Sequence, residues 1–364
     1  MQRRASTLFL STLAIPSIWM LSSCAQPTAN LSATAAETAL NIAPSYEWDV
    51  LSAIDPAVIK YQAKSVVFDS KSGAIGSNRQ SYQSVGYQRY SSNLIIYGLV
   101  TRNTSLVEAG IKVAEYAFAH QNEDGSFEDN STKTGVSTPT SVAFFLQDLG
   151  RSLLLCEQSS WFQTSQKTDR LRIRLNQLLP LTNRSLDWLM KQQAELIKGD
   201  GAGRATNRLF FDSLAFYLTG KALRSNRAVA VGEQFAKLAL QQQAEAGFFL
   251  ENRGQDSSYQ GVSLSKALLL LTNLKPESSG LRRQLWLAIQ KGVEWQLSSV
   301  LQTGEISADG NTRVYPGGEI YLKKEKKIDY LASVLALNYY SAISRNRDVQ
   351  STANRILLYY RTGG

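Results

Sequence analysis

The 364-residue chain contains very little histidine and cysteine. His120 is its single histidine, and Cys24 and Cys156 are its two cysteines. A zinc enzyme with several histidine ligands is therefore excluded, as are a cysteine-based zinc cluster and a framework of several disulfides. We expect no metal, no other cofactor and no redox chemistry.

Proline and charged residues are also sparse. The chain has 8 prolines, 19% charged residues and 43% hydrophobic residues, which is enough apolar material to build a large core. This composition excludes wholesale disorder and fibrous repeats. The charged residues favour the positive sign, with 39 Lys and Arg against 30 Asp and Glu, for a net charge of +9.

The first two dozen residues have the layout of a secretory signal. Two arginines precede an apolar stretch over residues 8–21, which is too short and too interrupted for a stable membrane span. The stretch ends in Leu21-Ser22-Ser23-Cys24, which resembles the lipobox of bacterial lipoproteins. The resemblance implies that residues 1–23 are removed and that Cys24 is acylated. The alternative is an ordinary secreted protein with a chance cysteine at the cleavage site.

The residues after Cys24 bear on where the protein would reside. Ala25 stands where an inner-membrane retention signal would place Asp, so the resemblance implies the outer membrane of a cell that has one. Residues 24–41 are rich in Ala, Thr, Ser and Asn and predict a flexible tether. Loss of residues 1–23 would leave a net charge of +7, spread along the chain without a nucleic-acid-binding motif. We therefore expect contact with a membrane through the lipid on Cys24, and no nucleic-acid partner.

From residue 46 onward the apolar residues recur at helical spacing, and the alternation typical of strands is hard to find. The pattern predicts an all-α chain. The clearest helices are expected at Leu106–His120, Thr138–Cys156, Arg170–Gln193, Thr206–Leu223, Ala228–Gln243, Ser258–Leu274, Leu281–Val300, Ile328–Ile343 and Val349–Tyr360, with weaker ones near Trp48–Ala63 and Gln88–Val100.

Several of these helices end in glutamine and run into a loop that carries glycine and an acid. The steps between Gln121, Gln193, Gln243 and Gln296 are 72, 50 and 53 residues. A repeat of this length with two helices per unit indicates an array of about five to six helical hairpins. We expect residues 42–364 to form an α/α toroid, with an open solenoid as the alternative. Glycine also ends helices for purely local reasons, but this does not explain the repeated phrase.

Three residues near the middle of the chain resemble a motif in the toroid domain of heparinase-type and alginate-lyase-type polysaccharide lyases. In that family an Asn opens a helix, and about fifty residues later a glycine-containing loop carries a Glu and then a Tyr. Here Asn207, Glu251 and Tyr259 match, and Tyr259 lies 52 positions after Asn207. The family usually has His after the Asn and often after the Tyr, whereas this chain has Arg208 and Gln260. The resemblance covers roughly residues 165–345.

The resemblance implies β-elimination at a uronic acid. Such an enzyme neutralises the uronate carboxylate, removes the adjacent carbon-bound proton and protonates the departing glycosidic oxygen. Asn207 would bind the carboxylate, Arg208 or Arg253 would supply positive charge, and Tyr259 would act first as base and then as acid. The purely structural alternatives are a helix cap for Asn207 and a packed aromatic side chain for Tyr259.

Hairpin toroids also resemble several glycoside hydrolase families, which use paired carboxylates. The candidates for this chemistry are Glu123, Asp124, Glu128, Asp129, Asp200, Glu251 and Asp256. Sugar contacts are expected from the loops, through the residues Glu123, Asp124, Phe249, Arg253 and Asp256, although loop aromatics also plug the core of hairpin arrays.

The sequence thus predicts an envelope lipoprotein that acts on or binds an acidic polysaccharide or oligosaccharide. A non-catalytic glycan-binding or scaffold lipoprotein on the same fold is the rival from another class, and the two missing histidines favour it. The basic cluster over residues 323–327 is interpreted as a solvated patch, with an acidic glycan or anionic lipid as alternative partners.

Overall fold

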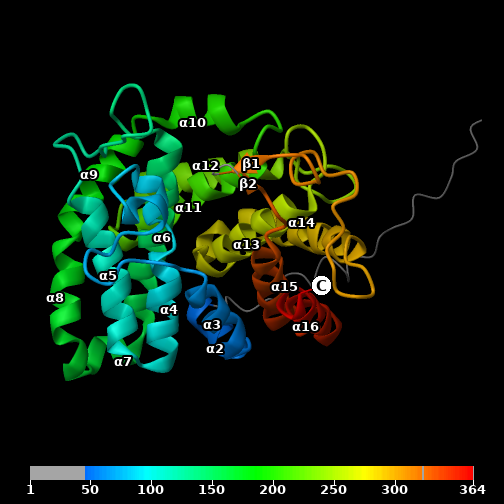
Figure 1. Cartoon of the computed structure of the whole chain (residues 1–364), viewed down its shortest axis with the longest axis horizontal. Helices are drawn as coiled ribbons and strands as arrows, with labels where there is room; N and C mark the ends of the chain where they lie inside the picture. The colour runs from blue at the N-terminus through cyan, green and yellow to red at the C-terminus, as the bar shows by residue number, and fades with distance from the viewer. Residues whose placement is uncertain (1–45, 322–323, 364) are drawn as a thin grey trace, which may run out of the picture.

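The computed structural model describes residues 46–321 and 324–363, and this part of the chain is mostly helical (Figure 1). The expectation of an all-α chain is confirmed. The strands in the described ranges are a short antiparallel pair, β1 (Ile320–Tyr321) and β2 (Lys324–Glu325). The predicted signal peptide, the tether and Cys24 lie outside the described residues.

The bounds of the helices are α2 (Glu47–Ala53), α3 (Pro56–Lys64), α4 (Ser91–Thr101), α5 (Thr104–Phe118), α6 (Pro139–Gln158), α7 (Ser160–Thr164), α8 (Asp169–Gln177), α9 (Leu179–Leu189), α10 (Gln193–Asp200), α11 (Thr206–Ala222), α12 (Asn226–Leu240), α13 (Ser257–Asn273), α14 (Ser279–Ser298), α15 (Tyr330–Ser344) and α16 (Arg347–Thr362). Long connections precede α4, α6, α13 and α15, and the other connections are short. Within the described part of the chain, four short 3-10 helices lie in the connections, at Gly76–Arg79, Val85–Gln88, Gln166–Thr168 and Pro276–Ser278.

The helices pack as hairpins. α4 packs on α5, α11 on α12, α13 on α14, and α15 on α16, while the long helix α6 contacts α9. The first helix of each hairpin also contacts its counterpart in the next, so that α3, α4, α6, α11, α13 and α15 touch in succession and α15 returns to α3. We call α4, α6, α11, α13 and α15 the inner helices and their partners the outer helices. Figure 1 shows outer helices α5 and α8 at one side and α14 and α16 at the other, with α13 and α15 between them.

The core fills the space between paired inner and outer helices. Phe216 of α11 stacks on Phe235 of α12 with ring centroids 5.4 Å apart. Between α5 and α6, the rings of Phe118, Phe127 and Phe145 form a cluster, and Phe127 comes from the loop that joins the two helices. Loop aromatics such as Phe127 therefore pack into the hydrophobic middle of the array.

The repeated glycine loop is the same turn in three places. Gly125, Gly247 and Gly304 follow outer helices and have φ values of +93°, +103° and +97°, a region that favours glycine. A Cβ atom on them would lie only 2.2, 2.5 and 2.4 Å from a backbone carbonyl oxygen of the next outer helix. Each turn thus fixes the spacing between consecutive outer helices, which explains why the glycine-containing sequence pattern recurs.

Three expected elements differ from the structure. The helix expected near Trp48–Ala63 is divided into α2 and α3, with Pro56 at the start of α3. The residues after Gln193 are not a loop of this type, because they form α10. The helix expected over 170–193 is divided into α8 and α9, since Pro180 at the start of α9 lacks the backbone N–H that a continuous helix needs.

The long connections from outer to inner helices gather at one end of the array. Asn130 after α5 donates its backbone N–H to Gln83 in the connection before α4. Asn252 after α12 donates to Arg204 before α11, and Thr312 after α14 donates to Gln255 before α13. These loop-to-loop bonds place the N-termini of the inner helices beside one another, at the end where the candidate site lies.

Candidate active site

Carboxylates cap four of the inner helices at this end. Asp148 accepts the backbone N–H of Ser92 in α4, and Asp329 accepts an N–H of α15. Asp256 accepts from four backbone groups, those of Ser258, Tyr259, Arg313 and Val314. Because its two oxygens already accept four hydrogen bonds, Asp256 holds the loops together. The expectation that Asp256 contacts a sugar is therefore wrong.

Glu251 is the fourth capping carboxylate, and it links the loop before α13 to the start of α11. Its side chain is fully buried, and Oε1 accepts the backbone N–H of Asn207 at 2.8 Å. Oε2 accepts a hydrogen bond from Arg313 Nη1 at 2.9 Å. Burial raises the pKa of Glu251 to about 7, against the opposing effects of the Asn207 N–H and the Arg313 guanidinium.

Arg313 connects Glu251 to Tyr259. It comes from the segment between α14 and α15, and its guanidinium carbon lies 3.9 Å from the centroid of the Tyr259 ring. The other guanidinium nitrogen, Nη2, is 3.2 Å from Glu319 Oε1. Asn207, Glu251 and Tyr259, which are separated by up to 52 positions in the sequence, are therefore part of one connected group.

The Tyr259 hydroxyl lies between a carboxylate and an ammonium. It donates a hydrogen bond to Glu319 Oε2 at 2.9 Å, and Lys326 Nζ contacts the same hydroxyl oxygen. Lys326 Nζ also lies 4.1 Å from the ring centroid and 3.8 Å from Glu319 Oε2. The hydroxyl therefore has an ionised proton acceptor and a cation within hydrogen-bonding reach.

The pKa values of these groups show how the proton is held. Burial raises the pKa of Tyr259 above its ordinary value of 10, although Arg313 opposes the shift. Burial opposes ionisation of Glu319, but the hydrogen bond from Tyr259, together with Lys326 and Arg313, lowers its pKa overall. Burial also lowers the pKa of Lys326, in part offset by Glu319. At rest the group contains a neutral phenol beside an ionised carboxylate.

The side chain of Tyr259 is shielded from solvent, whereas the side chains that contact it are partly exposed. Tyr259 is only 6% exposed, whereas the side chains of Arg313, Glu319 and Lys326 are 17%, 27% and 27% exposed. All three partners lie in the segment between α14 and α15, which contains β1 and β2 and runs back over the middle of the chain in Figure 1. Solvent therefore reaches the site from the side of this segment.

Arg208 forms an ion pair with Asp200, which lies near a further buried carboxyl group, that of Asp212. Its Nη1 is 3.2 Å from Asp200 Oδ1, and its side chain is 39% exposed. Asp212 lies one turn further along α11, and burial raises the pKa of both carboxyl groups, well above the ordinary value in the case of Asp212. Among the described residues, both carboxyl oxygens of Asp212 and Oδ1 of Asn207 lack a hydrogen-bond partner.

The remaining predicted residues lie elsewhere. Phe249 is fully buried and packs edge-on against Phe210, 5.1 Å away, so its ring belongs to the core and not to a sugar-binding surface. Arg253 is exposed at the turn before α13. Glu123 is exposed in the turn after α5, where the Asp124 carboxylate accepts hydrogen bonds from Ser126. Within the described ranges, no contact joins Glu123 or Asp124 to Tyr259.

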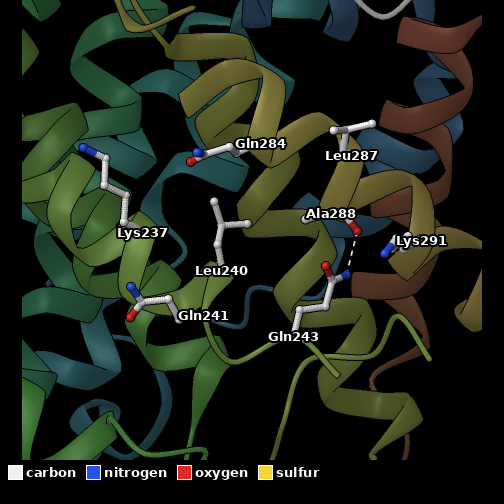
Figure 2. Close-up of a pocket in the computed structure, with 8 residues that line it drawn as sticks. All are labelled: Lys237, Leu240, Gln241, Gln243, Gln284, Leu287, Ala288 and Lys291. Carbon is white, nitrogen blue, oxygen red and sulfur yellow. Dashed lines mark hydrogen bonds between the residues drawn. The ribbon is translucent and has the colours of Figure 1, made fainter. Parts of the chain in front are cut away.

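A hollow of about 570 Å³ lies on the outer wall between α12 and α14 (Figure 2). It is lined by Lys237, Leu240, Gln241, Gln243, Gln284, Leu287, Ala288 and Lys291. Gln243 Nε2 donates to the Ala288 carbonyl at 2.7 Å, which ties the turn after α12 to the next outer helix. None of the candidate site residues lines this hollow.

Arg313, Glu319 and Lys326 were not found from the sequence. Lys326 belongs to the basic cluster over residues 323–327, which was interpreted as a solvated patch, and that interpretation does not hold for Lys326. The cluster was the only sequence signal that pointed to this segment as an anion-binding element. Arg313 and Glu319 have no distinctive pattern around them.

No family model matches the chain, and neither a curated protein nor a solved structure matches it. Within residues 46–321 and 324–363, no helix is long and apolar enough to cross a bilayer. In the same ranges, no group of three His, Cys, Asp or Glu side chains is placed to hold a metal ion.

Proposed function

We propose that the chain is an envelope-anchored lipoprotein whose α/α-toroid domain binds an acidic polysaccharide and cleaves it by β-elimination at uronic acid residues. The succession of contacts through the inner helices, which closes through α3, supports the toroid. The observation that carries the activity is the Tyr259 hydroxyl, held between Glu319 and Lys326 with the Arg313 guanidinium on its ring.

The proton balance of elimination fits this group. The C–H bond beside the uronate carboxylate breaks, a C=C bond forms, the glycosidic C–O bond breaks and the departing oxygen gains a proton. In the proposed reaction Tyr259 first passes its proton to Glu319, the ionised carboxylate that already accepts its hydrogen bond. The phenolate takes the carbon-bound proton and then delivers it to the leaving oxygen, while the Arg313 guanidinium and the Lys326 ammonium stabilise the negative charge.

Asn207 and Arg208 are the proposed contacts of the uronate carboxylate. Asn207 lies directly beside Glu251 at the start of α11, and Arg208 offers a partly exposed guanidinium. Neutralising that carboxylate makes the adjacent carbon-bound proton more acidic, which the reaction requires.

A glycoside hydrolase is the second candidate, because Arg313 holds two carboxyl groups of different character. Glu251, with a pKa raised to about 7, suits a proton donor, and Glu319, with a lowered pKa, suits an ionised base or nucleophile. The rings and cations of the site also suit a protein that only binds glycans.

The test uses the purified full chain with alginate, pectate, glucuronan and glycosaminoglycans. Two products are measured in parallel: the ultraviolet absorbance of the conjugated C=C bond, and new reducing ends. Elimination raises both signals on at least one polymer, and hydrolysis raises only reducing ends. Retardation in an affinity gel without either signal would show that the protein binds the polymer but does not cleave it. No response in any assay would contradict the proposal.

The anchoring part of the proposal is tested separately in bacterial cells. We expect a labelled fatty acid to be incorporated into the chain, and Cys24→Ala to abolish the label and release the protein from the membrane fraction. Cys156→Ala is the matched control, because Cys156 is 1% exposed in the core and burial raises its pKa. Equal labelling of the Cys24→Ala variant and the unaltered protein would contradict lipidation at this residue.

A further inference from the structure

Two further cations and two aromatic rings meet between the inner helices. Arg89, in the connection before α4, places its guanidinium carbon 4.7 Å from the centroid of the Phe144 ring in α6. Lys266 of α13 places Nζ 4.6 Å from the centroid of the Phe211 ring in α11. The two rings contact each other edge-on at 4.7 Å. All four side chains are partly exposed although they lie between largely buried helices, so solvent enters the space that they share.

Lys266 is poorly neutralised in this space. Its Nζ donates to Gln147 Oε1 at 3.2 Å, and within the described residues no carboxylate lies within ion-pairing distance of it. Burial lowers its pKa to about 8, with Arg151 and Arg89 acting in the same direction and Asp148 and Asp329 opposing. Both oxygens of Asp148 are already occupied by the hydroxyl and N–H groups of Ser91 and Ser92.

The same cations are electrostatically linked to the candidate active site. Arg89 also lowers the pKa of Lys326, the residue that contacts the Tyr259 hydroxyl. Phe211 lies one helical turn after Asn207 on α11, so the two side chains share a helix face. The group around Lys266 therefore adjoins the group around Tyr259.

We propose that Lys266 and Arg89, together with Phe211 and Phe144, form a subsite that binds the carboxylate of a second uronic acid residue, next to the sugar that is cleaved at Tyr259. A uronate suits the site because its carboxylate can pair with the ammonium and the guanidinium, while its apolar C–H face can contact aromatic rings. This assignment rests on the proposed function for the position next to it, but binding is measurable without cleavage.

Isothermal calorimetry tests the subsite with defined probes. The probes are trimers of mannuronate, galacturonate and glucuronate, each paired with a neutral trimer in which the carboxyl groups are reduced to alcohols. We expect the protein to bind at least one acidic trimer, and Lys266→Met to weaken that binding by about tenfold or more, as for a lost charge-assisted hydrogen bond. Lys237→Met, on the exposed outer wall, removes the same charge and is expected to leave the affinity unchanged.

Two further measurements separate charge from folding. Lys266→Arg keeps the charge and is expected to retain most of the affinity for the acidic trimer, and neither Lys266 variant is expected to change affinity for the neutral trimer. Binding of an anion raises the pKa of Lys266 from about 8, so the protein takes up protons on binding near pH 8, and Lys266→Met removes this uptake. Equal loss of acidic and neutral trimer binding would overturn the subsite, because the charge would then not be the cause.

The outcomes distinguish this inference from the proposed function. Binding of an acidic trimer that depends on Lys266, without cleavage of any polymer, would leave the subsite in place and overturn the lyase. Cleavage with unchanged KM in Lys266→Met would support the lyase and overturn the subsite. Failure to bind any acidic trimer would overturn the subsite.

Discussion

The interior of the helical array contains two tyrosines in closely similar chemical settings. Tyr339 of α15 donates its hydroxyl to Glu47 Oε1 at 3.0 Å and accepts a hydrogen bond from Arg151 Nη2 at 3.0 Å. Arg151 Nε also donates to the same Glu47 oxygen at 2.7 Å. The three residues are at most 6% exposed and join α2, α6 and α15. This tyrosine belongs to a sealed structural network.

Tyr259 has the same kinds of partner but differs in three respects. Its arginine, Arg313, lies over the ring, whereas Arg151 donates to the Tyr339 hydroxyl. Its glutamate and arginine, Glu319 and Arg313, are partly exposed, and Lys326 adds a second cation at the hydroxyl. A tyrosine that is bonded to a glutamate beside an arginine is therefore not by itself a sign of catalysis. Solvent access and the additional ammonium are what distinguish the candidate site, and each can be tested against the sealed network.

The largest expected difference concerns the two arginines. Arg151→Gln leaves Glu47 buried without its cation and is expected to lower the free energy of unfolding by about 3–5 kcal/mol. Arg313→Gln is expected to cost only about 1–3 kcal/mol, because Glu251 keeps the Asn207 N–H and can take up a proton. Denaturant unfolding near neutral pH measures both. An equal or larger cost for Arg313→Gln would remove the distinction between a sealed and an accessible network.

The pH dependence of stability is the next effect. Because burial raises the pKa of Glu251 from 4.5 to about 7, the folded protein holds a proton in this range that the unfolded chain has released. Stability is therefore lost as the pH rises from about 4.5 to about 7, by up to about 3 kcal/mol from this residue. Glu251→Gln is expected to flatten this part of the curve.

Glu319→Gln is the matched control for Glu251→Gln and has the opposite sign. The lowered pKa of Glu319 contributes stability that is present above its ordinary value of 4.5 and is lost as the pH falls through the folded value. This variant is therefore expected to remove stability from the upper part of the pH range. The same pH profile for both variants would contradict the assignment of one protonated and one ionised carboxyl group.

Lys326→Met tests the additional ammonium. On a polymer that the unaltered protein cleaves, we expect the rate to fall by about 10- to 100-fold, because the phenolate loses its nearest cation. Lys324→Met is the matched control, since Lys324 is exposed on β2 two residues away. Equal rates for the two variants would show that Lys326 has no part in the reaction.

The smallest expected effect is on the stability of the tyrosine variants. Tyr339→Phe removes one hydrogen bond to Glu47 and one from Arg151, and is expected to cost about 1–2 kcal/mol in denaturant unfolding. Tyr259→Phe is expected to cost about 1 kcal/mol or less, because solvent reaches its partners. A larger loss of stability in Tyr259→Phe would make that tyrosine a structural residue.

The sequence predicted the helices well because their apolar spacing is local information. The connection between Asn207, Glu251 and Tyr259 could also be anticipated, since all three open or precede inner helices in consecutive hairpins. The sequence could not show which of the loop residues lie in the core and which line the site. Phe249 and Phe127 are alike in sequence to surface aromatics, and only the packing of helix on helix places them in the core.

The partners of Tyr259 were beyond sequence reasoning for a different reason. Glu319 and Lys326 lie 60 and 67 positions after Tyr259, in a long connection without helical spacing. Their contact with Tyr259 depends on how that connection folds back over α13, which no short pattern specifies. The basic cluster around Lys326 indicated charge, but the side chain that reaches the tyrosine is fixed only by tertiary structure.

The most direct test of the account is the rate of conjugated C=C formation by Tyr259→Phe relative to Tyr339→Phe, on a polymer that the unaltered protein degrades. The account predicts that Tyr259→Phe loses at least about 100-fold in rate while it remains folded, and that Tyr339→Phe keeps a rate near that of the unaltered protein. A folded Tyr259→Phe variant with an undiminished rate would contradict it.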